Sequence, residues 1–280
     1  MKNRFPDILP YDYSRVTLQA LADDYVNASY IWDISPFVPP IIITQAPLKS
    51  TIVDFWTMIF EQRVEFIMCL LSDNELGGDV YWPTESEKNI IISNMVISLQ
   101  SISKKNHWTE RIITISIPDK KETSTLVHLQ FTVWPGSLFP VSPDPFVMYI
   151  REFISLYQQQ KHHSNPLVIH CLSGIGRSGV ACLLLFAILE VTNNSSTLTD
   201  LTSLTNKITS FRKNILRDRE HLKFAYQAFL TYMKQTVSND GDSIKSINTS
   251  FQEEKSPINT AKTDPLNTLD AFWASKRDKK

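Results

Sequence analysis

The chain reads His170-Cys171-Leu172-Ser173-Gly174-Ile175-Gly176-Arg177-Ser178-Gly179 at the point where an apolar strand-like run turns into an apolar helical run. The strand-like run covers residues 166–169 and the helical run covers 180–191. Backbone N–H groups in a glycine-rich loop that opens a helix point inward, and the helix dipole adds positive potential. Such a loop suits a doubly charged phosphate group. The residues expected to surround that group are Ser173, Gly174, Ile175 and Gly176.

Two side chains of this loop indicate the chemistry. Cys171 stands at the loop's start, where the free thiol pKa of about 8.5 is expected to fall. Arg177, six residues later, can hold two phosphate oxygens through its planar guanidinium. Together they predict attack of a thiolate on phosphorus. A lone cysteine is most often a small buried apolar residue, and that interpretation is favoured for Cys69 and Cys182.

Composition narrows the class of protein. The 280 residues are 42% hydrophobic, enough for one sizeable core plus a tail. A net charge of −1 gives no indication of nucleic-acid or membrane-surface binding. Three cysteines argue for a reducing compartment and against a disulfide framework. No apolar leader opens the chain, and the apolar run 180–189 is shorter than the roughly 20 residues that span a bilayer. We expect a cytoplasmic protein with no membrane span, cofactor or metal.

The first part of the chain alternates strand-like and helix-like segments, strands mostly early and helices mostly late. This predicts a domain of the α/β (α+β) class. Expected strands are Ile41–Thr44, Phe66–Leu71, Asn89–Leu99, Thr109–Ile117, Leu126–Val133 and Leu167–His170. Expected helices are Thr51–Gln62, Pro145–Gln160, Gly179–Val191, Thr199–Phe211 and Arg219–Lys234.

The composition changes near residue 237. Residues 1–236 are expected to form the domain, and 237–280 to form a disordered tail dominated by Ser, Asn, Thr, Asp and Lys. An apolar island at 269–273, Leu-Asp-Ala-Phe-Trp, interrupts this tail. The island is either inconsequential or a short docking motif.

The ten-residue loop resembles the phosphate loop of the non-receptor protein tyrosine phosphatases, where a cysteine and an arginine flank five residues. The resemblance extends over most of residues 1–235. It implies a twisted mixed β-sheet flanked by helices, and a phosphotyrosine-containing protein or peptide as substrate. The other matching segments are Lys2–Phe5, Asp24–Ile31, Thr44–Pro47, Asp54–Trp56, Tyr81–Pro83 and Trp134–Phe146.

The resemblance also implies roles for single residues. Phe5 would stack on the phosphotyrosine ring, so that only long aryl phosphates reach Cys171, although ordinary core packing is the alternative for Phe5. Asp7 would accept hydrogen bonds from the substrate backbone. His170 would sit behind Cys171 and help to hold the thiolate. Ser178 would hydrogen-bond the sulfur and aid breakdown of the phosphocysteine.

One departure from the family pattern concerns proton donation. In the loop that closes over substrate, the family has an aspartate that protonates the leaving oxygen, and this chain has Gly136. The leaving phenolate has a conjugate-acid pKa of about 10. General acid catalysis contributes about 10²–10⁴-fold, so we expect weak turnover. Asp144 is the nearest downstream carboxylate, and helix capping is its favoured role.

Further departures lie around the phosphate loop. Ser173 either hydrogen-bonds the thiolate or crowds the phosphate. Arg217 and His221 stand where the family places water-positioning glutamines. His221 either positions a water or lies on a helix surface, and Arg217 would add phosphate affinity. The acidic partner of Arg177 is expected to be Glu75, with Asp73 as the alternative.

These departures resemble the phosphatases that carry an N-terminal Bro1-type endosomal adaptor domain and a tail with a similar apolar island. The chain is similar to the phosphatase half of such a protein, with the helices before the substrate loop missing. The resemblance implies an endosome-associated location and partners among endosomal sorting (ESCRT-type) proteins. Two hypotheses therefore remain beside a weak phosphatase: a phosphotyrosine-binding pseudophosphatase, and a sorting scaffold that works through its tail.

Overall fold

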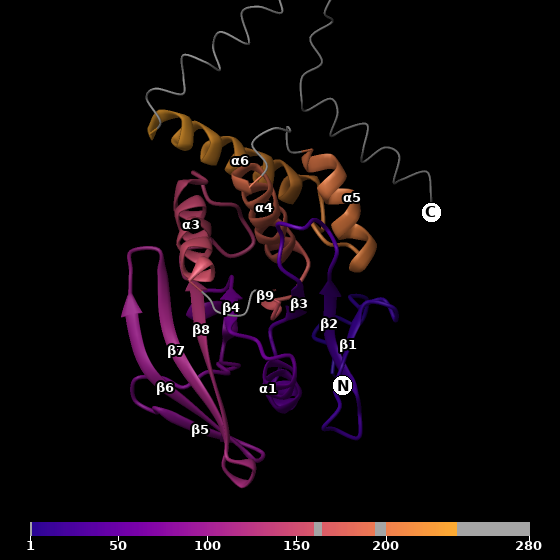
Figure 1. Cartoon of the computed structure of the whole chain (residues 1–280), viewed down its shortest axis with the longest axis vertical. Coiled ribbons are helices and arrows are strands. Elements are labelled where there is room, and N and C mark those ends of the chain that lie inside the picture. The colour runs from indigo at the N-terminus through magenta and orange to yellow at the C-terminus, as the bar shows by residue number, and fades with distance from the viewer. Residues whose placement is uncertain (1, 160–163, 194–199, 240–280) are drawn as a thin grey trace, which may run out of the picture. The chain divides into compact units, whose positions relative to one another are not determined.

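A computed structural model describes residues 2–159, 164–193 and 200–239 (Figure 1). The predicted tail lies almost wholly outside these residues, as does its apolar island at 269–273. The chain divides into two compact units, Met1–Phe229 and Leu230–Lys280. The predicted domain boundary at residue 236 stays a prediction, because helix α6 (Arg219–Asn239) continues through it.

A nine-stranded sheet forms the centre of the first unit, in the order β1-β2-β3-β9-β4-β8-β7-β6-β5. Strands β3, β9, β4 and β8 pair in parallel, and the outer pairs are antiparallel. The predicted class and mixed sheet are therefore confirmed. The strands are β1 (Arg15–Thr17), β2 (Tyr25–Ile31), β3 (Ile41–Gln45), β4 (Phe66–Cys69), β5 (Asn89–Ile92), β6 (Met95–Lys104), β7 (Trp108–Ile117), β8 (Glu122–Phe131) and β9 (Leu167–Cys171).

Strand β9 is mostly apolar, which suits a position at the centre of the sheet. Its residues are all buried, as expected for a strand covered on both faces. It pairs with β3 on one side, Gln45 opposite Cys171, and with β4 on the other, Cys69 opposite His170. Cys171 therefore stands at the carboxyl end of a central parallel strand, the edge where open α/β sheets bind their ligands.

Helices cover both faces of the sheet, as Figure 1 shows for α1 below it and α3, α4 and α5 above it. Side-chain alternation explains the two layers. Ile42, Ile67 and Val168 belong to one buried apolar cluster with Phe55 of α1. Phe66, on the opposite face of β4, packs against rings of α3. The helices are α1 (Ile52–Glu61), α2 (Asp73–Leu76), α3 (Asp144–Gln158), α4 (Gly176–Asn193), α5 (Leu201–Phe211) and α6, with short 3-10 turns at Lys49–Thr51 and Pro118–Lys120.

One expected strand was wrong. The segment Asn89–Leu99 is a hairpin in which β5 and β6 pair from Ile92 and Met95 outward. A two-residue turn joins them, and Ser93 has φ +56. Primed hairpin turns require positive φ at their first central residue, which is Ser93 here. The Ser-Asn pair at 93–94 was the turn signal inside an otherwise apolar run.

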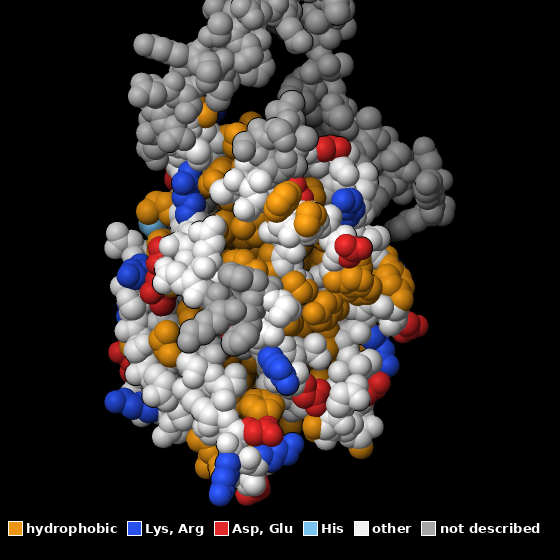
Figure 2. All heavy atoms as spheres, in the orientation of Figure 1, with side chains coloured by type: hydrophobic (Ala, Val, Ile, Leu, Met, Phe, Trp, Pro, Cys, Tyr) orange, Lys and Arg blue, Asp and Glu red, His pale blue; other side chains and the backbone are white. Residues whose placement is uncertain are grey.

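Helix α4 is longer than its apolar run predicted. Among the described residues it is the helix that meets the length and hydropathy of a membrane span, at 18 residues with a mean hydropathy of 1.3. In this domain 72% of that segment is buried by protein, as in a core helix. On the face seen in Figure 2, acidic and basic side chains are interspersed, in line with the net charge of −1.

Candidate active site

The glycines of the loop after β9 are explained by close packing. Gly174 has φ +71, and a Cβ there would overlap the main-chain carbonyl of Thr44. Any larger residue would therefore be strained and would also collide with β3. At Gly179 a Cβ would lie 2.6 Å from the backbone nitrogen of Leu216. The loop is clamped between β3 and the segment that precedes α6.

The thiol of Cys171 is buried, yet its pKa lies below its usual value. Burial acts to raise the pKa, and four interactions outweigh it. The largest is the Ser178 hydroxyl, followed by the Ser178 backbone N–H, the Arg177 charge and the Gly174 backbone N–H. By contrast, burial raises the pKa of Cys69 to about 12 and that of Cys182 further still. Of the three buried cysteines, Cys171 is thus the one whose thiol pKa is lowered, which favours its thiolate form.

Arg177 is held by several partners at once. Its Nη1 donates to an oxygen of Glu75 at 3.0 Å and its Nη2 to the other at 2.5 Å. This is the partner that the sequence predicted. Nη1 also donates to the Leu70 carbonyl at 2.9 Å, and Nη2 donates to the Gly136 carbonyl. The guanidinium carbon lies 5.3 Å from the ring centre of Trp134. These bonds use all four Nη hydrogens and leave the Nε hydrogen, so a phosphate oxygen must replace the Gly136 carbonyl on Nη2 before Arg177 can hold two oxygens.

A cavity of about 560 Å³ lies over the loop and collects most of the predicted site residues. Cys171 and Arg177 line it, while the side chains of His170 and Ser178 lie beneath its floor. Gly174, also predicted to surround the phosphate, is absent from the cavity lining. The other predicted residues on its wall are Phe5, Asp7, Ser173, Ile175, Gly176, Arg217 and His221.

Arg212 is a residue that sequence reasoning missed. It is completely buried at the end of α5. Its Nε donates to the Gly174 carbonyl at 2.8 Å and its Nη2 to the Ser173 carbonyl at 3.3 Å. Two further bonds reach Asn27 and Ser29 of β2. Turning these carbonyls outward toward Arg212 leaves the neighbouring N–H groups free to face an anion. No local pattern marks this arginine, since all its partners are distant in sequence.

The wall segment 134–139 forms one side of the cavity, which it lines with Trp134, Gly136, Ser137, Leu138 and Phe139. Trp134 is buried and its indole N–H donates to the Leu138 carbonyl at 2.8 Å. Gly136 has φ +60, and a Cβ there would meet open space. Asp144 is the first residue of α3 and interacts with the Ser142 hydroxyl. Asp144 is absent from the cavity lining. It is not the expected cap residue, because the N-cap of α3 is Pro143; Asp144 is an acidic side chain in the first turn, where the helix dipole favours it.

His221 is part of the cavity wall and not of an open helix surface. Its side chain is 14% exposed, and its ring lies 4.9 Å from that of Phe139. Its Nδ1 is 2.7 Å from an Asp218 oxygen. Arg217, just before, has φ +32 and an exposed side chain. The loop that carries it also holds Leu216 at φ +65, whose N–H donates to the Ile175 carbonyl.

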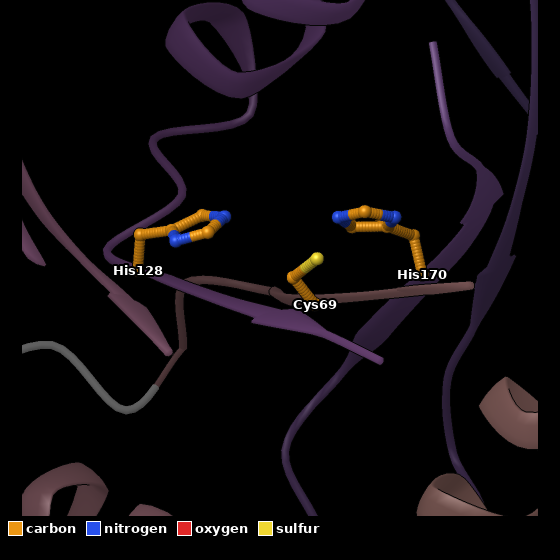
Figure 3. Close-up of side chains that lie close together, drawn as sticks. All are labelled: Cys69, His128 and His170. Atoms are coloured by element: carbon orange, nitrogen blue, oxygen red, sulfur yellow. The ribbon is translucent and has the colours of Figure 1, made fainter. Parts of the chain in front are cut away.

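A polar cluster lies behind the nucleophile. Cys69, His128 and His170 point the same way from neighbouring strands, with ligand atoms within 4.8 Å of one another (Figure 3). The donor types would suit a transition metal. However, the Tyr81 hydroxyl already engages Nε2 of His128 at 2.9 Å and of His170 at 2.6 Å. The cluster is thus a hydrogen-bonded core.

The same network sets the charge behind Cys171. The guanidinium of Arg111 lies 3.4 Å from Nδ1 of His128 and can only donate, so His128 carries its hydrogen on Nε2. Tyr81 then donates to His170. Burial lowers the pKa of His170 to about 4. His170 is therefore neutral at pH 7, and its Nε2 accepts from the Tyr81 hydroxyl.

A strand-end thiol of lowered pKa, an arginine and a glycine-rich helix start form a site that could hold a phosphate group beside a thiolate. Comparison with known proteins names the family. The model of the family described as protein-tyrosine phosphatase matches residues 1–231, and the chain belongs to this family.

The relatives are non-receptor members. Tyrosine-protein phosphatase non-receptor type 23 of Homo sapiens is 35% identical over 86% of this chain and 15% of its own length. Non-receptor type 20 of Mus musculus is 30% identical, over 85% of this chain and 55% of its own. Non-receptor type 2 of Mus musculus is 30% identical, over 92% and 63%. The chain thus spans only a small part of the type 23 relatives.

Proposed function

We propose that this domain hydrolyses phosphotyrosine through a phosphocysteine intermediate, and that it does so slowly. The observation that carries the proposal is the low-pKa thiol of Cys171 in one cavity with the fixed guanidinium of Arg177. The family membership supports a protein-tyrosine phosphatase hydrolase in general terms.

In the first step the Cys171 thiolate attacks phosphorus and the P–O bond to the tyrosine ring breaks. Arg177 and the loop N–H groups hold the three outer oxygens, where charge is carried in the transition state. Water then attacks phosphorus, the P–S bond breaks and the thiolate is regenerated. Ser178 assists this second step by stabilising the sulfur as it leaves.

Phe5 and Asp7 favour a tyrosine-containing peptide over a short phosphoserine. Both lie on the cavity wall, above a thiol that is only 3% exposed. A long aryl side chain can carry its phosphate that deep while the peptide backbone stays at the rim, within reach of Asp7. Arg217 on the same wall adds positive charge for an acidic substrate.

Slow turnover follows from Gly136. It lines the cavity at the position of the family's proton donor, and it has no side chain. The phenolate must then leave without a proton from this segment, at a cost of about 10²–10⁴-fold in rate. Substrates with acidic leaving groups should suffer least.

The same glycine favours a second function, a phosphotyrosine-binding pseudophosphatase. A site that keeps Cys171 and Arg177 but lacks the acid can bind phosphotyrosine and release it unchanged. The similarity to the type 23 phosphatases, together with the adaptor-type resemblance, favours a cytoplasmic, endosome-associated setting with sorting proteins as partners.

The test compares nitrophenyl phosphate, which has an acidic leaving group, with a phosphotyrosine peptide, using the wild-type chain and Cys171→Ser. Turnover of nitrophenyl phosphate that Cys171→Ser abolishes is the expected result. If the chain binds the peptide but turns over neither substrate, and Arg177→Met abolishes the binding, the phosphotyrosine-binding pseudophosphatase would be established instead. A chain that shows no turnover and no binding would contradict both functions.

A further inference from the structure

The cavity contains few side chains that can exchange a proton with a reacting group. Besides Cys171, the acidic or imidazole side chains on its described wall are Asp7, Glu75 and His221. Both oxygens of Glu75 are bound to Arg177, and this pairing outweighs burial and lowers its pKa. Asp7 is exposed at the rim. His221 is thus the remaining candidate for proton transfer deep in the cavity.

The ring of His221 is fixed by Asp218. An Asp218 oxygen lies 2.7 Å from Nδ1, and the same oxygen accepts hydrogen bonds from the backbone N–H groups of Glu220 and His221. The carboxylate therefore both caps the start of α6 and orients the ring. Because a carboxylate only accepts, the hydrogen of the neutral ring sits on Nδ1 and the lone pair sits on Nε2.

The lone pair points at the phosphate loop. A Cβ placed on Gly176, the residue before Arg177, would overlap Nε2 of His221. On the other side Phe139 meets the ring edge to face, at 4.9 Å between centres. Nε2 thus lies between the phosphate loop and Phe139 of the wall segment, in the cavity that Cys171 also lines.

The charges around the ring keep it neutral. Burial lowers its pKa, the Asp218 carboxylate acts to raise it, and Arg217 and Arg177 lower it, so the pKa lies below its usual value. The neighbours from the wall segment are aromatic. At pH 7 the imidazole has a lone pair to offer and no extra proton to give. It is suited to the role of a base and unsuited to that of an acid.

We propose that His221, oriented by Asp218, is the general base that activates the water in hydrolysis of the phosphocysteine. This rests on the proposed phosphatase function. Nε2 takes one proton from water as the oxygen bonds to phosphorus and the P–S bond breaks. The products are hydrogenphosphate, the Cys171 thiolate and an imidazolium, which then releases its proton to solvent. Asp218 is a positioning residue.

Pre-steady-state kinetics with nitrophenyl phosphate separate the two chemical steps. We expect His221→Gln to keep a burst of nitrophenol close to one per Cys171 while the steady-state rate falls by about 10²-fold or more. Phosphorylated Cys171 then accumulates, which intact-protein mass spectrometry detects. Asp218→Asn keeps the helix cap and should give a smaller loss in the same direction. Glu220→Gln, which alters an exposed pair with Lys223, is the control.

The pH profile adds a readout that a structural effect would not move. The wild-type breakdown rate should fall as pH drops below the pKa of His221, because a protonated ring cannot accept a proton. His221→Gln should lose this limb. A steady-state rate equal to that of Glu220→Gln, or equal losses of burst and steady state, would overturn the proposal. Absence of any Cys171-dependent nitrophenol release by the wild type would instead refute the phosphatase function itself.

Discussion

The Nε atom of Arg212 donates to the carbonyl oxygen of Gly174 at 2.8 Å, across a gap of 38 residues in sequence. The same guanidinium reaches Ser173, Asn27 and Ser29. One buried cation therefore fixes the phosphate loop to strand β2. Burial lowers its pKa only to about 10, so it remains charged at neutral pH.

Removing this cation should damage both stability and the site. Arg212→Met leaves the Gly174 carbonyl and the Asn27 oxygen buried without their donor, at about 1–3 kcal/mol each. We expect urea unfolding to show that the free energy of unfolding falls by about 3 kcal/mol, and we expect phosphate binding to weaken. Lys213→Met, an exposed neighbour, is the control. Equal midpoints for the two variants would contradict this role of Arg212.

Alanine substitution at two glycines distinguishes the cost of backbone strain from the cost of a steric collision. Gly77 and Gly174 both have positive φ, but a Cβ on Gly77 meets nothing within 4 Å and one on Gly174 meets Thr44. Gly77→Ala should cost only about 1–2 kcal/mol of conformational strain. Gly174→Ala should cost clearly more and should also abolish binding of inorganic vanadate. Thermal unfolding and vanadate titration of both variants test the difference, and similar losses in both would count against it.

Restoring a carboxylate at residue 136 should restore proton donation. The φ of +60 and the open space around Gly136 suit an aspartate, which tolerates left-handed backbone. For Gly136→Asp we expect a gain of about 10²-fold or more on a phosphotyrosine peptide and a smaller gain on nitrophenyl phosphate. Ser137→Asp places the same charge one residue away. Equal gains from both variants would mean that charge, not proton transfer, is responsible.

Alkylation should distinguish the three cysteines. Iodoacetamide reacts with thiolates, so at pH 7 it should modify Cys171 while Cys69 and Cys182 stay protected in the folded protein. The Ser178 hydroxyl is the largest of the influences that lower the Cys171 pKa, so Ser178→Ala should raise that pKa and move the midpoint of the alkylation profile to higher pH. Peptide mass mapping over a pH series measures this. An unshifted midpoint would show that Ser178 does not hold the sulfur.

The sequence was most informative where the chemistry is local. The loop from His170 to Gly179 contains the strand end, the glycines and the helix start in one stretch, so both the fold class and the placing of Cys171 beside Arg177 could be read from it. Glu75 was also identified, since family spacing restricted the choice to two acids.

Long-range partners escaped sequence reasoning. Tyr81 carries the link between His128 and His170, and Arg212 holds the loop, but neither lies near its partners in the chain. His221 was left with two interpretations, because a helix start does not reveal which wall it faces. The wrong prediction of one strand over Asn89–Leu99 had a local cause. A turn of two residues interrupts the segment, although its apolar pattern is continuous.

The residues that line the cavity are far apart in the sequence, and this affects when the site can form during translation. Phe5 comes from the first residues of the domain, Cys171 from its last third and His221 from near its end. Contacts of such sequence separation form late, and domains emerge from the ribosome N-terminus first. Until Arg212 and His221 have been synthesised, Cys171 is an ordinary thiol at the end of a sheet that α5 and α6 do not yet cover. Nascent chains should therefore carry no phosphate-binding capacity until translation is nearly past the domain.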